Sequence, residues 1–188
     1  MYLIIDTETS GLPYDFSAPV SRLDNWPRVI WLGFILLDEN LEIIREGNYY
    51  INPGMKISEN VAKVLGISDE IVQKYGNPTS EILHIFKDVC KNAKYLIGHN
   101  LDYDYKVISA EIIRNNFNLS LKRKKRVCTM INSKEFVNKK SSDNKLTYPK
   151  LSDLFKKLYE EDFFSKCPFD DVKYAVKCFI KMREKEMV

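Results

Sequence analysis

Short apolar runs separated by turn residues occupy the first third of the chain and predict strands. Residues 2–8 form an apolar, β-branched stretch that the breaker Ser10-Gly11-Leu12-Pro13 follows, which is typical of a buried strand ending in a turn. Residues 14–27 have two further prolines and little periodicity, so we expect a loop there. Apolar runs at 29–37 and 41–51, joined by a polar turn, predict an antiparallel hairpin.

After residue 58 the spacing of apolar positions becomes helical. Caps and apolar periodicity predict helices, with two short apolar strands among them. The expected helices cover residues 58–65, 68–74, 78–90, 101–115, 150–159 and 170–185. The expected strands cover residues 95–98 and 126–131, and the lysine-rich segment 133–147 is expected to be a mobile loop. Strands first, then strands alternating with helices, indicate an α/β fold in which helices cover a mixed sheet.

Length and composition suit one globular domain, residues 1–188. No segment approaches the roughly 18 unbroken apolar residues of a membrane span, and the amino terminus has no basic-then-apolar leader. We therefore expect a soluble, cytoplasmic protein with no membrane partner. The four cysteines are widely spaced without a CxxC pair and there are two histidines, which argues for reduced thiols and against a zinc site.

The charge is distributed unevenly, although the net value of +3 neither requires nor excludes a polyanionic partner. Residues 122–126 are five consecutive basic side chains, while acidic residues gather at 160–162 and 170–171. Such a basic run is most often a solvated loop, and binding to phosphates is the alternative. The lysine-rich stretch 133–145 suits either a protein or a nucleic-acid partner.

Two acids close the first predicted strand. Side chains alternate across a strand, so Asp6 and Glu8 point to the same face, about two strand rises apart. Acids at the end of a buried apolar strand are costly unless a positive charge neutralises them, and hard cations such as Mg²⁺ prefer oxygen ligands. These two residues by themselves fit a shared cation and a solvated acidic strand end equally well.

Two further acidic pairs stand at predicted helix starts. Asp102 and Asp104 follow the strand 95–98, and the helix dipole favours carboxylates in a first turn whatever their function. The apolar stripe of that helix slightly favours Asp104 as the inward one. Asp170 and Asp171 open the last helix, where one of them is expected to act as N-cap.

In order, spacing and placement, these acidic segments resemble the three exonuclease motifs of the DEDD superfamily. The similarity is greatest to the DnaQ-like group, which includes the proofreading subunit of bacterial replicative polymerase. The first motif stands as Asp6-Thr7-Glu8-Thr9-Ser10-Gly11-Leu12-Pro13 and the second as His99-Asn100-Leu101-Asp102-Tyr103-Asp104. The third is Asp171-Val172 at the start of an apolar helix. The resemblance runs over residues 3–182 and includes the segment Val64-Leu65-Gly66-Ile67.

The resemblance implies a ribonuclease-H-like mixed β-sheet flanked by α-helices, and a 3′-to-5′ exonuclease that uses two Mg²⁺ or Mn²⁺ ions. It implies that four acids are catalytic metal ligands, namely Asp6, Glu8, Asp104 and Asp171, with Asp6 bridging both ions. Two ions held ~3.5–4 Å apart assist in-line displacement at phosphorus.

The same resemblance assigns residues to the strand end. Leu12 would wedge beside the terminal base, Thr7 would offer its backbone to the terminal sugar, and Asn100 and Tyr103 would line the site. The expected partners are the single-stranded or frayed 3′ end of a nucleic acid, and a polymerase or another replication or repair protein.

One position departs from the family pattern. The general base in this group is a His five residues before the last Asp or a Tyr four residues before it, and these positions hold Lys166 and Cys167. Lysine is protonated at neutral pH, with a reference pKa of ~10.4 in peptides, so Lys166 is a poor base, although it can pair with a phosphate. His99 belongs to the second motif, and His84 lies in an earlier helix. A missing base typically costs on the order of 10²–10⁴ in rate.

Three hypotheses follow from this pattern. The first is a metal-dependent exonuclease, slowed or using an unusual base, and four retained acids favour it. The second is a nuclease-derived module that binds nucleic-acid 3′ ends but scarcely cuts them, which the replacement of His by Lys166 favours. The third is a different metal-dependent phosphotransferase on the same ribonuclease-H-like fold, which the order of the acids fits more loosely.

Overall fold

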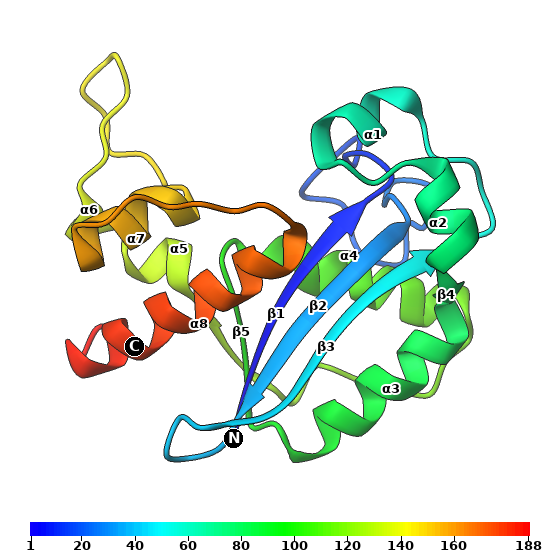
Figure 1. Cartoon of the computed structure of the whole chain (residues 1–188), viewed down its shortest axis with the longest axis horizontal. Coiled ribbons are helices and arrows are strands. Elements are labelled where there is room, and N and C mark those ends of the chain that lie inside the picture. Colours follow the sequence, from blue (N-terminus) through cyan, green and yellow to red (C-terminus); the bar gives the residue numbers. More distant parts are fainter.

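A six-stranded mixed sheet with the strand order β4-β3-β2-β1-β5-β6 is the centre of the computed structural model, which describes all residues 1–188 (Figure 1). The strands are β1 (Tyr2–Thr9), β2 (Val29–Leu37), β3 (Ile43–Asn52), β4 (Asn77–Pro78), β5 (Tyr95–Gly98) and β6 (Lys125–Cys128). β2 pairs antiparallel with both β1 and β3, whereas β5 runs parallel to β1 and β6 parallel to β5. The expected mixed sheet is confirmed.

Helices cover both faces of this sheet. They are α1 (Glu59–Leu65), α2 (Asp69–Tyr75), α3 (Thr79–Asn92), α4 (Leu101–Arg114), α5 (Thr129–Asn132), α6 (Lys134–Val137), α7 (Leu151–Tyr159) and α8 (Pro168–Glu184). One apolar cluster joins α3 and α4 to the sheet, and a second joins α2 and α8 to the opposite face. None of the helices is both long and apolar enough to cross a membrane.

Side chains of β1 alternate between the two faces of the sheet, and this alternation decides which covering helices each side chain contacts. Leu3 and Ile5 belong to the cluster under α3 and α4, whereas Tyr2 and Ile4 belong to the cluster under α8. Continuing the alternation toward the carboxyl end of β1, Asp6 and Glu8 share the α8 face and Thr7 the α4 face. The strand therefore ends with acids on one side of the sheet and a hydroxyl on the other.

Two expectations about the second half of the chain are wrong. The strand expected at 126–131 ends at Cys128, because its partner β5 ends at Gly98 and leaves nothing further to pair with. Thr129–Asn132 form α5 instead. The segment 133–147 is more than a loop, because Lys134–Val137 form α6, whose apolar side chains pack on the α7–α8 cluster, and Lys140 pairs with Leu146 in an isolated antiparallel bridge.

One boundary also differs before α3. The helix expected from Pro78 begins at Thr79, because Asn77 and Pro78 pair with Ile51 and Asn52 of β3 as the short strand β4. A two-residue strand has too little periodicity to be visible in a sequence.

The basic run of residues 122–126 lies at the far end of the sheet from the acids of β1. Lys125 pairs with Tyr95, which also pairs with Tyr2 at the start of β1. Lys124 donates to the backbone carbonyls of Cys90 and Ala93 at the end of α3. The run thus stabilises a helix end and a strand start, and it does not adjoin Glu8.

Candidate active site

Three carboxylates from two elements meet at the carboxyl end of β1. Asp6 and Glu8 from β1 and Asp171 from α8 each offer an oxygen, and the three oxygens lie within 4.8 Å of one another. The sequence predicted the pairing of Asp6 with Glu8 from strand alternation alone. Asp171 belongs to the last helix of the chain, and the structure brings it to the same point as the acids of the first strand.

Gly33 leaves room on the sheet for both the ring of Trp31 and the side chain of Val172 on α8. Gly33 is the register partner of Asp6 on β2. A Cβ placed on Gly33 would stand 2.7 Å from a side-chain carbon of Val172, which is closer than real packing allows. A glycine here lets Val172 pack directly on the sheet, and the adjacent Asp171 is carried to the carboxylates of β1.

The fourth predicted acid, Asp104, lies in the first turn of α4 and is 3% exposed. The hydroxyl of Thr7 donates a 2.7 Å hydrogen bond to its Oδ1 across the interface between β1 and α4. Asp102, in contrast, is exposed and pairs with Lys106 at 2.7 Å on the helix surface. Of the two candidate acids in this segment, the structure therefore turns Asp104 toward the site.

Burial raises the pKa of all four acids, and repulsion within the group raises it further for Asp6, Glu8 and Asp104. Burial raises the pKa of Asp6, and the charges of Asp104, Glu8 and Asp171 raise it further. Burial raises the pKa of Glu8 to about 7, with Asp171 adding to the effect. Burial also raises the pKa of Asp104 to about 7 against the opposing hydrogen bond from Thr7, and it raises the pKa of Asp171.

No lysine, arginine or histidine lies within 4.0 Å of the oxygens of these four acids to compensate them. Moreover, Oδ1 of Asp171 is buried without any hydrogen-bond partner. Buried charges are normally paired with a cation or coordinate a metal. An all-oxygen donor set with an unpartnered carboxylate oxygen fits a hard divalent cation such as Mg²⁺ or Mn²⁺.

An apolar cleft of about 370 Å³ adjoins Glu8 on the side of α1. Its walls include Leu12 from the loop after β1 together with Val64 and Leu65 from α1, the helix that lies over the carboxyl end of β1 in Figure 1. Leu12 is 76% and Val64 82% exposed, so two aliphatic side chains stand open to solvent beside the same hollow. The cleft has the character of a site for a flat, partly apolar group.

Tyr103 anchors the loop that carries Leu12. Its hydroxyl lies 2.5 Å from the Thr9 hydroxyl and donates to the carbonyl of Gly11 at 3.3 Å. The Thr9 hydroxyl also donates to the Gly11 carbonyl, at 2.7 Å. Tyr103 therefore lines the cleft and also fixes the backbone immediately before Leu12.

A second hollow, of about 240 Å³, adjoins the first and shares Glu8, Val64 and Leu65 with it. Lys166 and Cys167 line it together with Glu8 and Asp171. Lys166, which the resemblance places at the general-base position, therefore lies next to the acids. The expected N-cap role of Asp170 or Asp171 is wrong, because α8 begins at Pro168 after Cys167, and Asp170 instead accepts a hydrogen bond from the backbone of Lys166 at 2.9 Å.

Neither histidine is free to act at this site. Nδ1 of His99 lies 3.0 Å from the Thr129 hydroxyl and Nε2 lies 3.0 Å from the Pro149 carbonyl, so both nitrogens are engaged. Burial lowers the pKa of His99 and favours the neutral ring. His84 is exposed on α3 and packs edge-on against Phe117. His99 links β5 to the segment before α7.

Asn100 stands at the turn between β5 and α4 with φ 70° and ψ 38°. This left-handed conformation is one that asparagine tolerates better than most residues, so backbone geometry already explains its presence. Sequence reasoning did not single out Val64 as a surface residue or Ser165 as part of the second hollow. A valine in an amphipathic helix normally indicates core, and only its exposure in the structure identifies it.

Comparison with known proteins matches most of the chain to one family. The model of the RNase_T family, described as exonucleases, matches residues 3–179. The PolC-type DNA polymerase III of Ureaplasma parvum is 26% identical over 114 residues, which is 60% of this chain and 7% of that polymerase. The PolC-type enzyme of Lactococcus lactis is 29% identical over 114 residues, 61% of this chain and 6% of the polymerase. The matched segment is thus less than a tenth of the length of these relatives.

Solved structures agree in fold. The nuclease domain of 3′hExo, a DEDDh family member bound to rAMP, has a TM-score of 0.72 at 19% identity, covering 98% of this chain and 92% of that one. Escherichia coli exonuclease I in complex with a dA16 oligonucleotide has a TM-score of 0.73 at 13% identity, covering 99% of this chain and 41% of that one. The fold is therefore the ribonuclease-H-like mixed sheet of the DEDD exonucleases.

Proposed function

The chain belongs to the RNase_T family of exonucleases, and from this premise we propose that it is a metal-dependent 3′-to-5′ exonuclease acting on DNA or RNA. The observation that carries the proposal is the cluster of Asp6, Glu8 and Asp171, whose oxygens lie within 4.8 Å of one another, with one oxygen of Asp171 buried and unpartnered. A purely binding module has little use for buried, uncompensated acids facing a phosphate.

Asp6, Glu8, Asp104 and Asp171 are proposed to hold two Mg²⁺ or Mn²⁺ ions. Bound divalent cations supply Lewis acidity toward the phosphodiester and lower the pKa of water. The chain's own contribution is to hold Asp6, Glu8 and Asp171 together, with Gly33 under α8, and to orient Asp104 through the Thr7 hydrogen bond on α4. In the proposed reaction, water adds to the terminal phosphorus and the bond to the penultimate 3′ oxygen breaks. The products are a nucleoside 5′-monophosphate and a strand one nucleotide shorter.

The terminal base is proposed to enter the apolar cleft between Leu12 and Val64, where binding removes both exposed side chains from water. Thr7 is proposed to offer its backbone to the terminal sugar, while Asn100 and Tyr103 border the strand end. Tyr103 contributes indirectly as well, because it holds the loop before Leu12.

Lys166 is proposed to pair with the scissile phosphate or a neighbouring one, since it lines the hollow beside Glu8 and Asp171. A protonated amine does not accept a proton from water, so the proton is expected to leave to solvent and hydrolysis to be slow for this family. This same residue supports a second candidate function, a module that grips nucleic-acid 3′ ends and scarcely cleaves them.

Association with a polymerase or another replication or repair protein is a further part of the proposal. Its support is that the matching curated relatives are PolC-type DNA polymerases. The segment they share with this chain is a small part of each polymerase.

The test is release of mononucleotides from 3′-labelled single-stranded DNA and RNA in Mg²⁺ or Mn²⁺, beside an Asp6→Ala control. Metal-dependent shortening from the 3′ end that disappears in the control is the expected result, and it names the substrate. Binding of the strand without shortening in either metal would support the binding module instead.

A further inference from the structure

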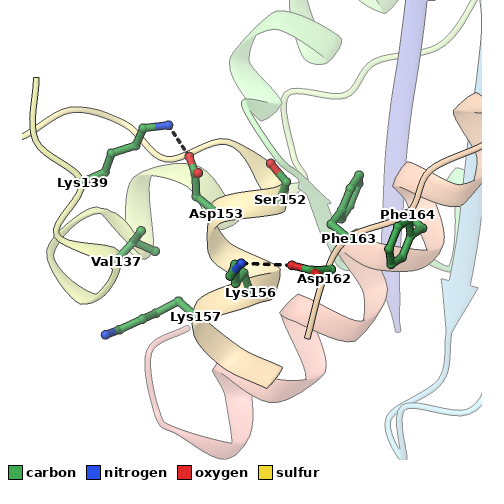
Figure 2. Close-up of a pocket in the computed structure, with 9 residues that line it drawn as sticks. All are labelled: Val137, Lys139, Ser152, Asp153, Lys156, Lys157, Asp162, Phe163 and Phe164. Carbon is green, nitrogen blue, oxygen red and sulfur yellow. Dashed lines mark hydrogen bonds and ion pairs between the residues drawn. The ribbon is translucent and has the colours of Figure 1, made fainter. Parts of the chain in front are cut away.

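Three hollows follow one another along the surface from the candidate active site to α7. The hollow beside Glu8 shares Lys166 with a hollow of about 190 Å³ on α8. That hollow shares Phe164 with a cavity of about 680 Å³ over α7, which Figure 2 shows. We name the last two together the α7–α8 groove. Figure 1 shows the connection between α7 and α8 running toward the carboxyl end of β1.

The α7–α8 groove is positively charged. Six lysines and three aspartates line it: Lys139, Lys156, Lys157, Lys166, Lys173 and Lys177, with Asp153, Asp162 and Asp170. Figure 2 shows two of the resulting ion pairs, Lys139 with Asp153 and Lys156 with Asp162, at 2.5 and 3.0 Å. The third joins Lys173 to Asp170 at 3.7 Å.

The other three lysines of the groove, Lys157, Lys166 and Lys177, have no carboxylate within 4.0 Å. Three lysines are thus available to anions after every aspartate is paired. Because they lie in both hollows of the groove, from α7 to the edge of the active site, they suit a long anion rather than a single small one.

One aromatic ring stands open at the junction of the two hollows. Phe164 is 72% exposed, whereas its neighbour Phe163 packs against Phe155 and Tyr174, with ring centroids 6.3 and 4.3 Å away. The backbone N–H of Phe164 donates to the Tyr174 hydroxyl at 3.3 Å. The loop is therefore anchored by Phe163 and Tyr174 while the ring of Phe164 remains free to stack.

We propose that the α7–α8 groove binds the single-stranded nucleic acid upstream of the reacting 3′ end, with phosphates on Lys157, Lys166 and Lys177 and a base on Phe164. Lysines along a groove with an interleaved aromatic ring are how single strands are held without sequence preference. Continuity with the acid cluster through Lys166 selects a nucleic-acid strand over an acidic peptide, because the strand's own 3′ end occupies the adjoining site. The inference rests on the proposed exonuclease function.

Two measurements distinguish strand binding by the groove from exonuclease activity at the acid cluster. Fluorescence anisotropy measures the affinity for a single-stranded DNA of roughly 16 nucleotides, the upper end of common site sizes, with phosphorothioate linkages that slow hydrolysis. Hydrolysis of a trinucleotide reports on the acid cluster alone. The variants are Phe164→Ala and the double variant Lys157→Gln with Lys177→Gln. Lys87→Gln on α3, on the opposite face of the sheet, is the matched control.

Phe164→Ala is expected to weaken binding of the long strand about 5- to 100-fold, the usual effect of removing the ring that stacks on one base. The double lysine variant is expected to reduce the slope of log affinity against log salt by about 0.7 for each phosphate that no longer has a lysine partner. Trinucleotide hydrolysis and the Lys87→Gln control should stay within about twofold of the unaltered protein.

Long-strand affinity within twofold of the control in both groove variants would overturn the inference even if the trinucleotide is cleaved. The inference would also be overturned if the groove variants keep their affinity for the strand but no longer bind a poly-glutamate peptide. That result would assign the groove to an acidic protein segment. Absence of trinucleotide cleavage by the unaltered protein counts against the exonuclease, while anisotropy still decides the groove. Because Phe164 is exposed, its truncation is not expected to affect folding.

Discussion

The Thr7 hydroxyl donates a 2.7 Å hydrogen bond to Oδ1 of Asp104 and so joins the end of β1 to the first turn of α4. The two residues are separated by 97 positions. Asp6 and Glu8, on either side of Thr7, face the opposite layer with Asp171. One strand end thus presents acids to α8 and orients a fourth acid on α4 through a single hydroxyl.

Thr7→Val is expected to reduce kcat much more than it changes KM, because it removes a bond that orients Asp104 while keeping a side chain of the same size in the wall of the apolar cleft. Hydrogen bonds to charged groups are worth about 1.5–3 kcal/mol, which corresponds to roughly a 10- to 100-fold fall in kcat. Steady-state kinetics on a single-stranded oligonucleotide measure it. Thr7→Ser keeps the hydroxyl and should retain most of the activity; equal losses in both variants would show that the hydroxyl is not what matters.

Leu12→Ala and Val64→Ala are expected to raise KM with little change in kcat. Both side chains are exposed in the free protein and leave water only when a base enters the cleft. Fully burying an aliphatic side chain is worth ~1.5–3 kcal/mol, so KM should rise roughly 10- to 100-fold. Ile43→Ala on β3, which is 58% exposed and distant from the cleft, is the matched control. Unchanged KM in both variants would show that the cleft does not bind the terminal base.

Lys166→His is expected to raise kcat by at least tenfold, because a general base contributes on the order of 10²–10⁴ and this position lines the hollow beside Glu8 and Asp171. The gain should appear as activity that rises with pH near the pKa of histidine, ~6.5 in peptides. Lys181→His, near the end of α8, is the control for adding a histidine away from the acids. No gain from Lys166→His would show that this position is not the vacant base.

The metal-free protein is expected to lose stability as pH rises from about 4 to about 7. The pKa of Glu8 rises from 4.5 to about 7 on folding and that of Asp104 from 3.8 to about 7, so the folded state binds more protons than the unfolded chain in this window. Their stabilising contribution is complete below the unfolded pKa values and disappears as pH passes the folded ones.

Thermal unfolding in EDTA between pH 5 and pH 8 measures this effect. Asp104→Asn should flatten the pH dependence, with ~2–4 °C expected for each kcal/mol in a chain of this size. Asp102→Asn, on the exposed side of the same helix turn, should not. Mn²⁺ at pH 8 should restore the midpoint of the unaltered protein. A pH profile shared by all three proteins would contradict the assignment.

The sequence predicted the layer structure well, because α3, α4 and α8 carry apolar periodicities that match their buried faces. The unbroken apolar runs of β1 and β2 match strands that are buried on both faces of the sheet. It predicted a strand at Thr129–Ile131 wrongly, since strand length there depends on where the partner β5 ends. The two-residue β4 and the four-residue α6 are too short for any periodicity, and they form because β3 and the α7–α8 cluster lie alongside them.

For the site, strand alternation alone predicted that Asp6 and Glu8 share a face. The apolar stripe of α4 favoured Asp104 over Asp102 only slightly, and the hydrogen bond from Thr7 that holds Asp104 inward is a long-range contact. The approach of Asp171 depends on packing of α8 over Gly33, which local pattern does not encode. The roles of all four acids remain predictions. The cleft around Val64 exists because nothing covers that face of α1. From its sequence pattern, such an apolar helix face is expected to be buried in the core.

A comparison of Asp171→Asn with Asp170→Asn tests most directly whether the acid cluster carries the activity. The two neighbours open the same helix, but Asp171 joins the acid cluster with an unpartnered oxygen, whereas Asp170 accepts from the backbone of Lys166. Shortening of 3′-labelled single-stranded DNA in Mn²⁺ is the measurement. We predict a fall of at least 100-fold in Asp171→Asn and activity within about threefold of the unaltered protein in Asp170→Asn. Similar activity in the two variants would contradict a catalytic role for the cluster.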